Sequence, residues 1–290
     1  MRPGPGGAPR VLVGGPRRGV MGAPRGGVVG RRGVDCEDRG VPVTIPYAPG
    51  PHRFGELTLP AGPPRGVVVV VHGGFWRHAY DLDLGRPLAA DLAAAGFAAW
   101  NIEYRRVGGG GGWPATFDDV AAAVDAIAGP VHDAAGELPL DRVVAVGHSA
   151  GGHLAAWLAA RPGLPSGAPG AEPRVVLRGA VSQAGVLDLV DAFEQRLGRD
   201  AVRELLGGPP AAFPDRYALA SPIARVPIGV PVIGVHGTAD DRVPVRQTER
   251  FAAASGDRWT RLDGVDHFAV IDPTTAAWAA CRAALEELLA

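Results

Sequence analysis

The chain has 290 residues, of which 47% are hydrophobic, so it is long enough to form one large or two small domains with a buried core. Its formal net charge of −1 gives no overall basic signal for nucleic acid or for an anionic membrane, and we expect neither as a partner. All 29 basic residues are arginines, which excludes a Walker phosphate loop and a pyridoxal-phosphate Schiff base, because both need a lysine.

The first part of the chain differs from the rest in charge and composition. Residues 1–34 hold seven arginines and no acidic residue, so the remainder has 22 basic and 30 acidic residues and a net charge of −8. Residues 1–40 are dominated by Gly, Pro and Arg without a hydrophobic period, and such a segment buries too little surface to offset its ordering entropy. We predict a disordered tail over 1–40 and one domain over 41–290.

The apolar runs and the cysteines bear on cellular location. The longest unbroken apolar run, around Val67–Val71, is too short to cross a bilayer, and the N-terminus shows no secretory pattern. Cys36 and Cys281 form neither a metal-binding spacing nor a disulfide framework. We therefore expect a cytoplasmic protein with a buried free thiol at Cys281.

Apolar runs alternate with helical patterns through the rest of the chain. We expect strands over 54–60, 66–71, 97–102, 143–146, 175–182, 231–235 and 258–262, and helices over 84–95, 116–128, 150–160, 244–254 and 274–289. Two short helices within 187–206 and a loop over 207–222 form an insertion that could cap a site. This alternation predicts an α/β fold, a mostly parallel central sheet with helices on both faces, and ligands in such sheets bind at the carboxyl ends of the strands.

A Gly-x-Ser-x-Gly motif, Gly147-His148-Ser149-Ala150-Gly151, stands between the strand 143–146 and the helix 150–160. Small residues on both sides let strand and helix come close, so that the central residue projects from the sheet edge in a strained conformation. The positive end of the helix points at the same place. These features predict a nucleophile elbow with Ser149 as the nucleophile.

A serine hydroxyl needs a base to take its proton, and the base needs a carboxylate to fix its tautomer. Histidine has a suitable pKa, and in hydrolases with this turn the nucleophile, the acid and the histidine follow in that order. The chain offers Ser149, then Asp240 or Asp241, then His267. Asp240 is preferred because it lies where the exit loop of the strand 231–235 should point at the base. Asp241 would then be a helix-start or surface carboxylate.

The loop after the strand 66–71 carries the other predicted parts of the site. A tetrahedral intermediate needs N–H donors, and we expect them from Ala150 and from Gly74 or Phe75, where two glycines allow close backbone approach. His72, Trp76 and Tyr80 are predicted to line the substrate pocket.

The remaining histidines have other predicted places. His148 and His236 are expected to bind backbone groups, and His153 to lie in the core or behind the site. No His-Glu-x-x-His occurs, so we expect no metal.

Over roughly residues 41–290 the chain resembles the α/β-hydrolase superfamily. The oxyanion loop His72–Trp76, the elbow Gly147–Gly151, the acid loop His236–Pro244 and the histidine loop Asp266–Phe268 come in the family's order. His-Gly-Gly-Phe-Trp, Tyr104-Arg105, Gly-His-Ser-Ala-Gly-Gly-His and Asp-His-Phe are similar to the esterase/lipase group that includes the kynurenine formamidases (arylformamidases). The resemblance implies hydrolysis of small acyl esters or N-formyl aromatic amides without a cofactor.

Several functions stay open at this point. The first expectation is a serine hydrolase that forms an acyl-enzyme on a small-molecule ester or amide, either arylformamidase-like or a short-chain carboxylesterase. Alternatives are an acetyl/feruloyl esterase, a prolyl-oligopeptidase-like hydrolase, and a catalytically silent α/β-hydrolase that binds a ligand or partner. The sequence leaves the oligomeric state open, with a homodimer as one option.

Overall fold

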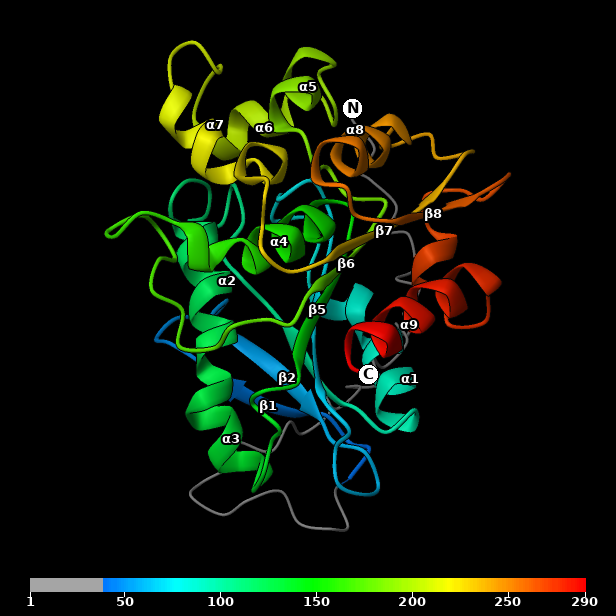
Figure 1. Cartoon of the computed structure of the whole chain (residues 1–290). Coiled ribbons are helices and arrows are strands. Elements are labelled where there is room, and N and C mark those ends of the chain that lie inside the picture. Colours follow the sequence, from blue (N-terminus) through cyan, green and yellow to red (C-terminus); the bar gives the residue numbers. More distant parts are fainter. Residues whose placement is uncertain (1–38) are drawn as a thin grey trace, which may run out of the picture.

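The computed structural model describes residues 39–290, which form an eight-stranded sheet with helices on both faces (Figure 1). The strand order is β1-β2-β4-β3-β5-β6-β7-β8, with β1 and β2 antiparallel to their neighbours and the other strands parallel. The strands are β1 (Val43–Pro46), β2 (Phe54–Thr58), β3 (Val67–Val71), β4 (Ala98–Ile102), β5 (Val143–His148), β6 (Ala180–Gln183), β7 (Val232–Gly237) and β8 (Trp259–Leu262). This arrangement confirms the predicted α/β-hydrolase fold.

Two groups of helices cover the sheet. The helices α1 (Arg86–Ala94) and α9 (Ala276–Leu288) pack on one face, where they share a core with the sheet. The opposite face is covered by α2 (Ala115–Asp125), α3 (Pro130–Ala135), α4 (Ala150–Ala159) and α8 (Arg246–Ser255). A third group, α5 (Leu189–Glu194), α6 (Ala201–Leu206) and α7 (Pro214–Ala220), follows β6 and lies at one end of the molecule (Figure 1).

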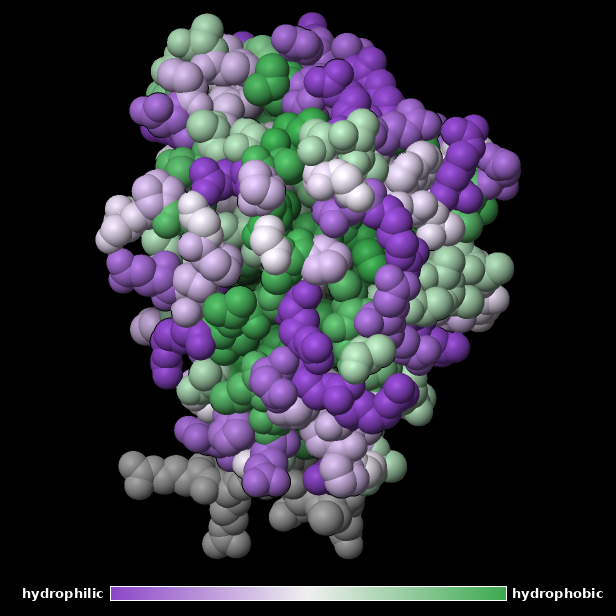
Figure 2. Space-filling model, viewed as in Figure 1, coloured by the Kyte–Doolittle hydropathy of each residue, from purple (hydrophilic) through white to green (hydrophobic). Residues whose placement is uncertain are grey.

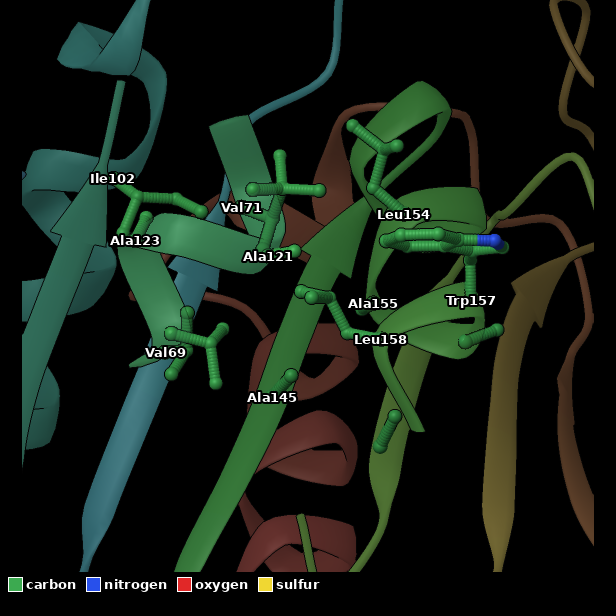
Figure 3. Close-up of a cluster of buried hydrophobic side chains, with 14 of the residues drawn as sticks. Val69, Val71, Ile102, Ala121, Ala123, Ala145, Leu154, Ala155, Trp157 and Leu158 are labelled. Carbon is green, nitrogen blue, oxygen red and sulfur yellow. The ribbon is translucent and has the colours of Figure 1, made fainter. Parts of the chain in front are cut away.

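The middle strands of the sheet, from β3 to β7, are buried on both faces, as a continuous apolar run predicts. In β3, Val67, Val69 and Val71 face the α2–α4 side, whereas Val68 and Val70 face α1 and α9, since successive side chains of a strand alternate. Figure 3 shows part of the first core, where side chains of α2 and α4 pack over β3, β4 and β5. This packing fixes α4, and with it the residue that precedes it, against the middle of the sheet.

The predicted elements were found with a few differences. The strand β6 starts five residues later than predicted, because the N–H groups of Arg174 and Val175 bind the Asp125 carboxylate instead of a neighbouring strand. The predicted loop 207–222 contains α7, which begins with a proline that favours the first turn of a helix. The short elements β1 and α3 were not predicted.

Three further predictions concern the whole chain. The disordered tail falls, except for residues 39 and 40, outside the described residues, and so does Cys36. The thiol of Cys281 is buried, and burial raises its pKa to about 12, as expected for an unreactive core cysteine. Within residues 39–290 no helix has the length and apolar character needed to cross a membrane.

Figure 2 shows hydrophilic residues at the top of the same view, in the region of α8.

The crossing of β5 and α4 yields a stability prediction. A Cβ at Gly147 would collide with the backbone of Gly151, so Gly147→Ala should destabilise the fold by about 1–3 kcal/mol or more, measured by urea unfolding. Gly62→Ala is the matched control, because a Cβ there meets open space. Equal stability of the two variants would contradict this account of the turn.

Candidate active site

Ser149 occupies a strained turn between β5 and α4. Its backbone has φ +56° and ψ −116°, a conformation that non-glycine residues adopt at a cost of about 1–3 kcal/mol. The turn can be this sharp because its glycines leave room: a Cβ at Gly147 would collide with Gly151, and a Cβ at Gly151 with the carbonyl of Val71. The structure therefore places Ser149 at the carboxyl edge of the sheet, ahead of the first turn of α4.

Asp240 and His267 are brought together from the loops after β7 and β8. Nδ1 of His267 lies 2.6 Å from Oδ2 of Asp240, the distance of a charge-assisted hydrogen bond. The other carboxylate oxygen accepts hydrogen bonds from the backbone N–H groups of Arg242 and Val243, both at 2.8 Å. Asp241, the alternative acid, is 74% exposed and pairs only with Arg242. The geometry thus selects Asp240 as the partner of His267.

His236 also contacts the acid, which sequence reasoning did not foresee. Its Nε2 lies 2.9 Å from the carbonyl oxygen of Val243, the expected backbone contact, and 3.2 Å from Oδ2 of Asp240. Its Nδ1 lies 2.8 Å from the hydroxyl of Thr248. Burial by itself would raise the pKa of Asp240, but hydrogen bonds from His236 and His267 outweigh it and hold that pKa well below its usual range. The carboxylate is therefore charged at neutral pH.

The side chain of His148 holds the backbone of His267. Its Nε2 donates to the carbonyl oxygen of His267 at 2.8 Å, and the two rings lie 4.4 Å apart. Burial, reinforced by the neighbouring His267, lowers the pKa of His148 to about 3, so this side chain is neutral. His148 thus makes the backbone contact that the sequence predicted, and the contact holds the histidine loop against the elbow.

The predicted oxyanion loop lies directly against the elbow. A Cβ at Gly73 would come within 3.2 Å of the Cβ of Ser149, and Gly74 and Phe75 both have positive φ. Among residues 39–290 no hydrogen bond uses the backbone N–H of Gly74, Phe75 or Ala150. These three N–H groups are consequently free to donate to a ligand beside Ser149.

A buried polar network supports this loop. The carboxylate of Glu103 accepts hydrogen bonds from the guanidinium of Arg106 and from the backbone N–H of Leu82, and it lies 3.2 Å from Nε2 of His72. The hydroxyl of Tyr104 donates to the carbonyl oxygen of His72 at 2.8 Å, and the two rings stack. The Tyr-Arg motif after β4 thus leads into the residues that position the start of the oxyanion loop.

A pocket of about 130 Å³ joins these parts. Its lining residues come from the oxyanion loop and the segment that follows it, the elbow, the acid loop and the histidine loop. They are Gly74, Phe75, Tyr80, Leu84, His148, Ser149, Arg242, His267 and Phe268. Ser149 and His267 therefore face one small space. Sequence reasoning missed Leu84, Arg242 and Phe268 as lining residues, although the last two are neighbours of predicted site residues.

Two predicted pocket residues lie elsewhere. Trp76 is almost completely buried, and its indole N–H donates to Nδ1 of His153 at 3.1 Å, so it packs between the oxyanion loop and α4. His153 is buried as predicted, and its Nε2 donates to the carbonyl oxygen of Ala220. His72 points into the polar network around Glu103. The expectation that Trp76 and His72 line the pocket is corrected, because both side chains find hydrogen-bond partners inside the protein.

No metal site accompanies this arrangement. Across the part of the chain that the structure describes, no group of three or more His, Cys, Asp or Glu side chains is placed to hold a metal ion.

The buried histidines yield a prediction on pH. Burial lowers the pKa of His148 to about 3 and of His153 to about 4, whereas in the unfolded chain both titrate near 6.5. Because only the unfolded chain then takes up these protons, stability is full above pH 6.5 and decreases below it. We expect a loss of about 2 kcal/mol between pH 6.5 and 5.5, measured by urea unfolding. His153→Gln should roughly halve this loss, and a flat pH dependence would contradict the burial of the two rings.

Known proteins are similar to this chain in sequence and in fold. The probable carboxylic ester hydrolase LipM of Mycobacterium tuberculosis is 31% identical over 206 residues, which are 69% of this chain and 46% of LipM. Esterase LipQ of the same organism is 27% identical over 241 residues, 74% of this chain and 56% of LipQ. The chain thus spans about half the length of the curated relatives it matches.

The chain is also similar to a solved structure and matches a protein family. The propionate-bound esterase Est2 of the planctomycete Thermogutta terrifontis superposes with a TM-score of 0.66 and 25% identity, over 86% of this chain and 93% of Est2. The BD-FAE family matches residues 57–254, which run from β2 to the end of α8 and include the elbow and the acid loop. Because this match covers more than half of the chain, the protein is a member of the BD-FAE family, with an α/β-hydrolase fold.

Proposed function

We propose that the protein hydrolyses small carboxylic esters through an acyl-enzyme formed on Ser149. The observation that carries this proposal is the shared pocket: Ser149 and His267 line one small space, and Nδ1 of His267 is held by Asp240 at 2.6 Å. A proton on Nδ1 leaves Nε2 of His267 free to accept the serine proton. The names of LipM and LipQ, a probable carboxylic ester hydrolase and an esterase, support the same reaction class.

The reaction would proceed in two halves. The hydroxyl oxygen of Ser149 attacks the ester carbonyl carbon while His267 takes its proton. The carbonyl oxygen becomes negatively charged and accepts hydrogen bonds from the free N–H groups of Ala150 and of Gly74 or Phe75. The bond to the alcohol oxygen then breaks, and the alcohol leaves with the proton from His267. Water repeats the sequence on the acyl-enzyme and releases the acid and the free serine.

The size of the pocket supports a short acyl group. Its volume is about 130 Å³, and the side chains of Phe75, Leu84 and Phe268 close it with apolar surface. One structure of Est2 holds bound propionate and another holds bound butyrate, and both are short-chain acids. We propose acetyl and propionyl esters as substrates ahead of long-chain esters.

The narrower arylformamidase-like activity is a second candidate. Phe268 and Tyr80 line the pocket and remain 52% and 46% exposed, so two aromatic side chains flank its entrance. Such a rim favours substrates with an aromatic group, including N-formyl aromatic amides. A panel of short p-nitrophenyl esters beside N-formylkynurenine separates the candidates: preference for the formyl amide would identify an arylformamidase, and activity on acetyl or propionyl esters alone would identify a carboxylesterase.

Other expectations from the sequence stay predictions. These are the cytoplasmic location, the absence of nucleic-acid and membrane partners, the absence of a cofactor, and the homodimer. The acetyl/feruloyl esterase, the prolyl-oligopeptidase-like hydrolase and the silent binding module also stay alternatives, and the experiments below distinguish the last of them.

Removal of the nucleophile is the first test. Ser149→Ala should abolish turnover of p-nitrophenyl acetate and labelling by a fluorophosphonate probe, because Ser149 is the only serine or threonine among the described residues that line the pocket. Ser166→Ala, an exposed serine outside the site, is the control and should keep both properties. A wild-type protein that is folded but neither turns over the ester nor reacts with the probe would favour the silent binding module.

The neighbouring aspartates allow a matched test of the acid. Asp240→Asn should lower kcat by about 10³- to 10⁴-fold, because an amide no longer selects the reactive tautomer of His267 or stabilises its cation. Asp241→Asn should change kcat by less than about two-fold, since that exposed side chain contacts only Arg242. Esterase kinetics on the two folded variants check this prediction, and similar losses in both would overturn the assignment of Asp240.

A further inference from the structure

A second cavity adjoins the serine pocket. Its volume is about 360 Å³, and it is lined by Phe75, Arg77, Tyr80, Gly198, Arg199, Asp241 and Arg242. Phe75, Tyr80 and Arg242 also line the serine pocket, so the two spaces share a wall. The second cavity, called the outer cavity below, therefore lies where the part of a substrate outside the serine pocket would extend.

The outer cavity has an excess of positive charge. Arg77 is neutralised by the carboxylate of Glu204, with hydrogen bonds of 2.7 and 2.9 Å. The side chain of Arg199 has no hydrogen bond or ion pair with any residue in 39–290. Arg242 is 54% exposed and contacts Asp241, the only carboxylate in the lining, at 3.2 Å. Because an ion pair between two exposed side chains is weak, Arg242 can exchange Asp241 for another anion at little cost.

The loop that carries Arg199 is held in place. The guanidinium of Arg77 donates to the carbonyl oxygen of Arg199 at 3.1 Å. Arg77, which is paired with Glu204, therefore holds the backbone of Arg199 in place. A Cβ at Gly198 would collide with the ring of Phe75, which shows that the loop packs directly on the oxyanion loop. Arg199 itself has φ +56°. The unpaired guanidinium thus belongs to a loop anchored beside the site rather than to a free surface segment.

The charge of the outer cavity stands against an acidic domain. Residues 1–38 hold seven of the arginines and three of the acidic residues, so the described domain has more carboxylates than arginines. The two arginines next to the candidate nucleophile therefore form a local positive region on a domain that is acidic as a whole. Guanidinium groups bind carboxylates through paired N–H donors, which gives such a site selectivity for planar anions.

We propose that the outer cavity binds a carboxylate on the alcohol part of the ester, with Arg199 and Arg242 as its ligands. The inference rests on the proposed esterase function. The serine pocket is lined by Gly74 and Phe75, which have free backbone N–H groups, and it is the smaller space. It therefore takes the carbonyl and the short acyl group, and the alcohol part extends into the outer cavity. The substrate class is thus short-chain esters of carboxylate-bearing alcohols or phenols.

Two substrates that differ only in charge test the proposal. These are 4-acetoxybenzoate, whose leaving phenol carries a carboxylate, and 4-acetoxybenzamide, whose leaving phenol carries a neutral amide of similar shape. The wild-type protein should show a kcat/KM about three- to ten-fold higher for the anionic ester, as expected for two solvent-exposed charge contacts. This preference should decrease as the salt concentration rises.

Arginine variants locate the effect. The double variant Arg199→Gln, Arg242→Gln should lower the ratio of the two kcat/KM values to about one. Arg178→Gln is the matched control, because Arg178 is exposed and precedes β6 at the opposite edge of the sheet, and it should keep the wild-type ratio. An equal ratio in the wild-type protein and in the double variant would overturn the carboxylate site.

A binding measurement separates this inference from the proposed function. Isothermal titration of the Ser149→Ala protein with both compounds should give tighter binding of 4-acetoxybenzoate, and the Arg199→Gln, Arg242→Gln changes should remove the difference. If the wild-type protein hydrolyses neither compound but the preference in binding persists, the esterase function fails and the anion site stands. If both esters are hydrolysed and binding shows no preference, the anion site fails and the esterase function stands.

Discussion

The structure depends on a backbone crossing that has no room for side chains. At the end of β5 the chain reverses into α4, with Gly147 against Gly151 and Gly151 against the carbonyl of Val71 in β3. This contact brings the first turn of α4 next to the loop after β3, and both segments have backbone N–H groups without a hydrogen bond among residues 39–290. It also forces Ser149 into a strained backbone conformation with positive φ. As a direct result of this crossing, Ser149 lines a pocket at the sheet edge although it is almost completely buried.

Three histidines around the crossing have different roles, and two of them stabilise the charge of the buried Asp240 carboxylate. His148 stays neutral in its buried place and holds the backbone of His267, while His236 and His267 both contact Asp240. Burial works against a charged Asp240, and these hydrogen bonds reverse its effect. Among residues 39–290 the ion-pair partners of this carboxylate are His236 and His267, and no arginine pairs with it. Arg199 and Arg242 line the adjoining outer cavity, where the side chain of Arg242 is exposed to water.

Local patterns were sufficient for most of the fold. The apolar runs that became β3, β4, β5 and β7 are buried on both faces, and a strand of that kind is visible in any window of the sequence. The differences arose where local signals were weak or were overruled. The strand β6 begins late because the carboxylate of Asp125, about fifty residues away, binds the backbone of Arg174 and Val175. The helix α7 was hidden in a segment rich in proline and glycine.

The sequence by itself determined the fold class, the order of the motifs and the serine turn, because each depends on residue types within a short stretch or on their order along the chain. The sequence offered the neighbouring residues Asp240 and Asp241 as the acid, and only the expected direction of the loop favoured Asp240. Only the tertiary structure decided that Asp240 meets His267, that Trp76 and His72 turn into the interior, and that Arg199 and Arg242 share a cavity. The direction of a loop side chain is set by partners that are distant in the sequence, so no local pattern can specify it.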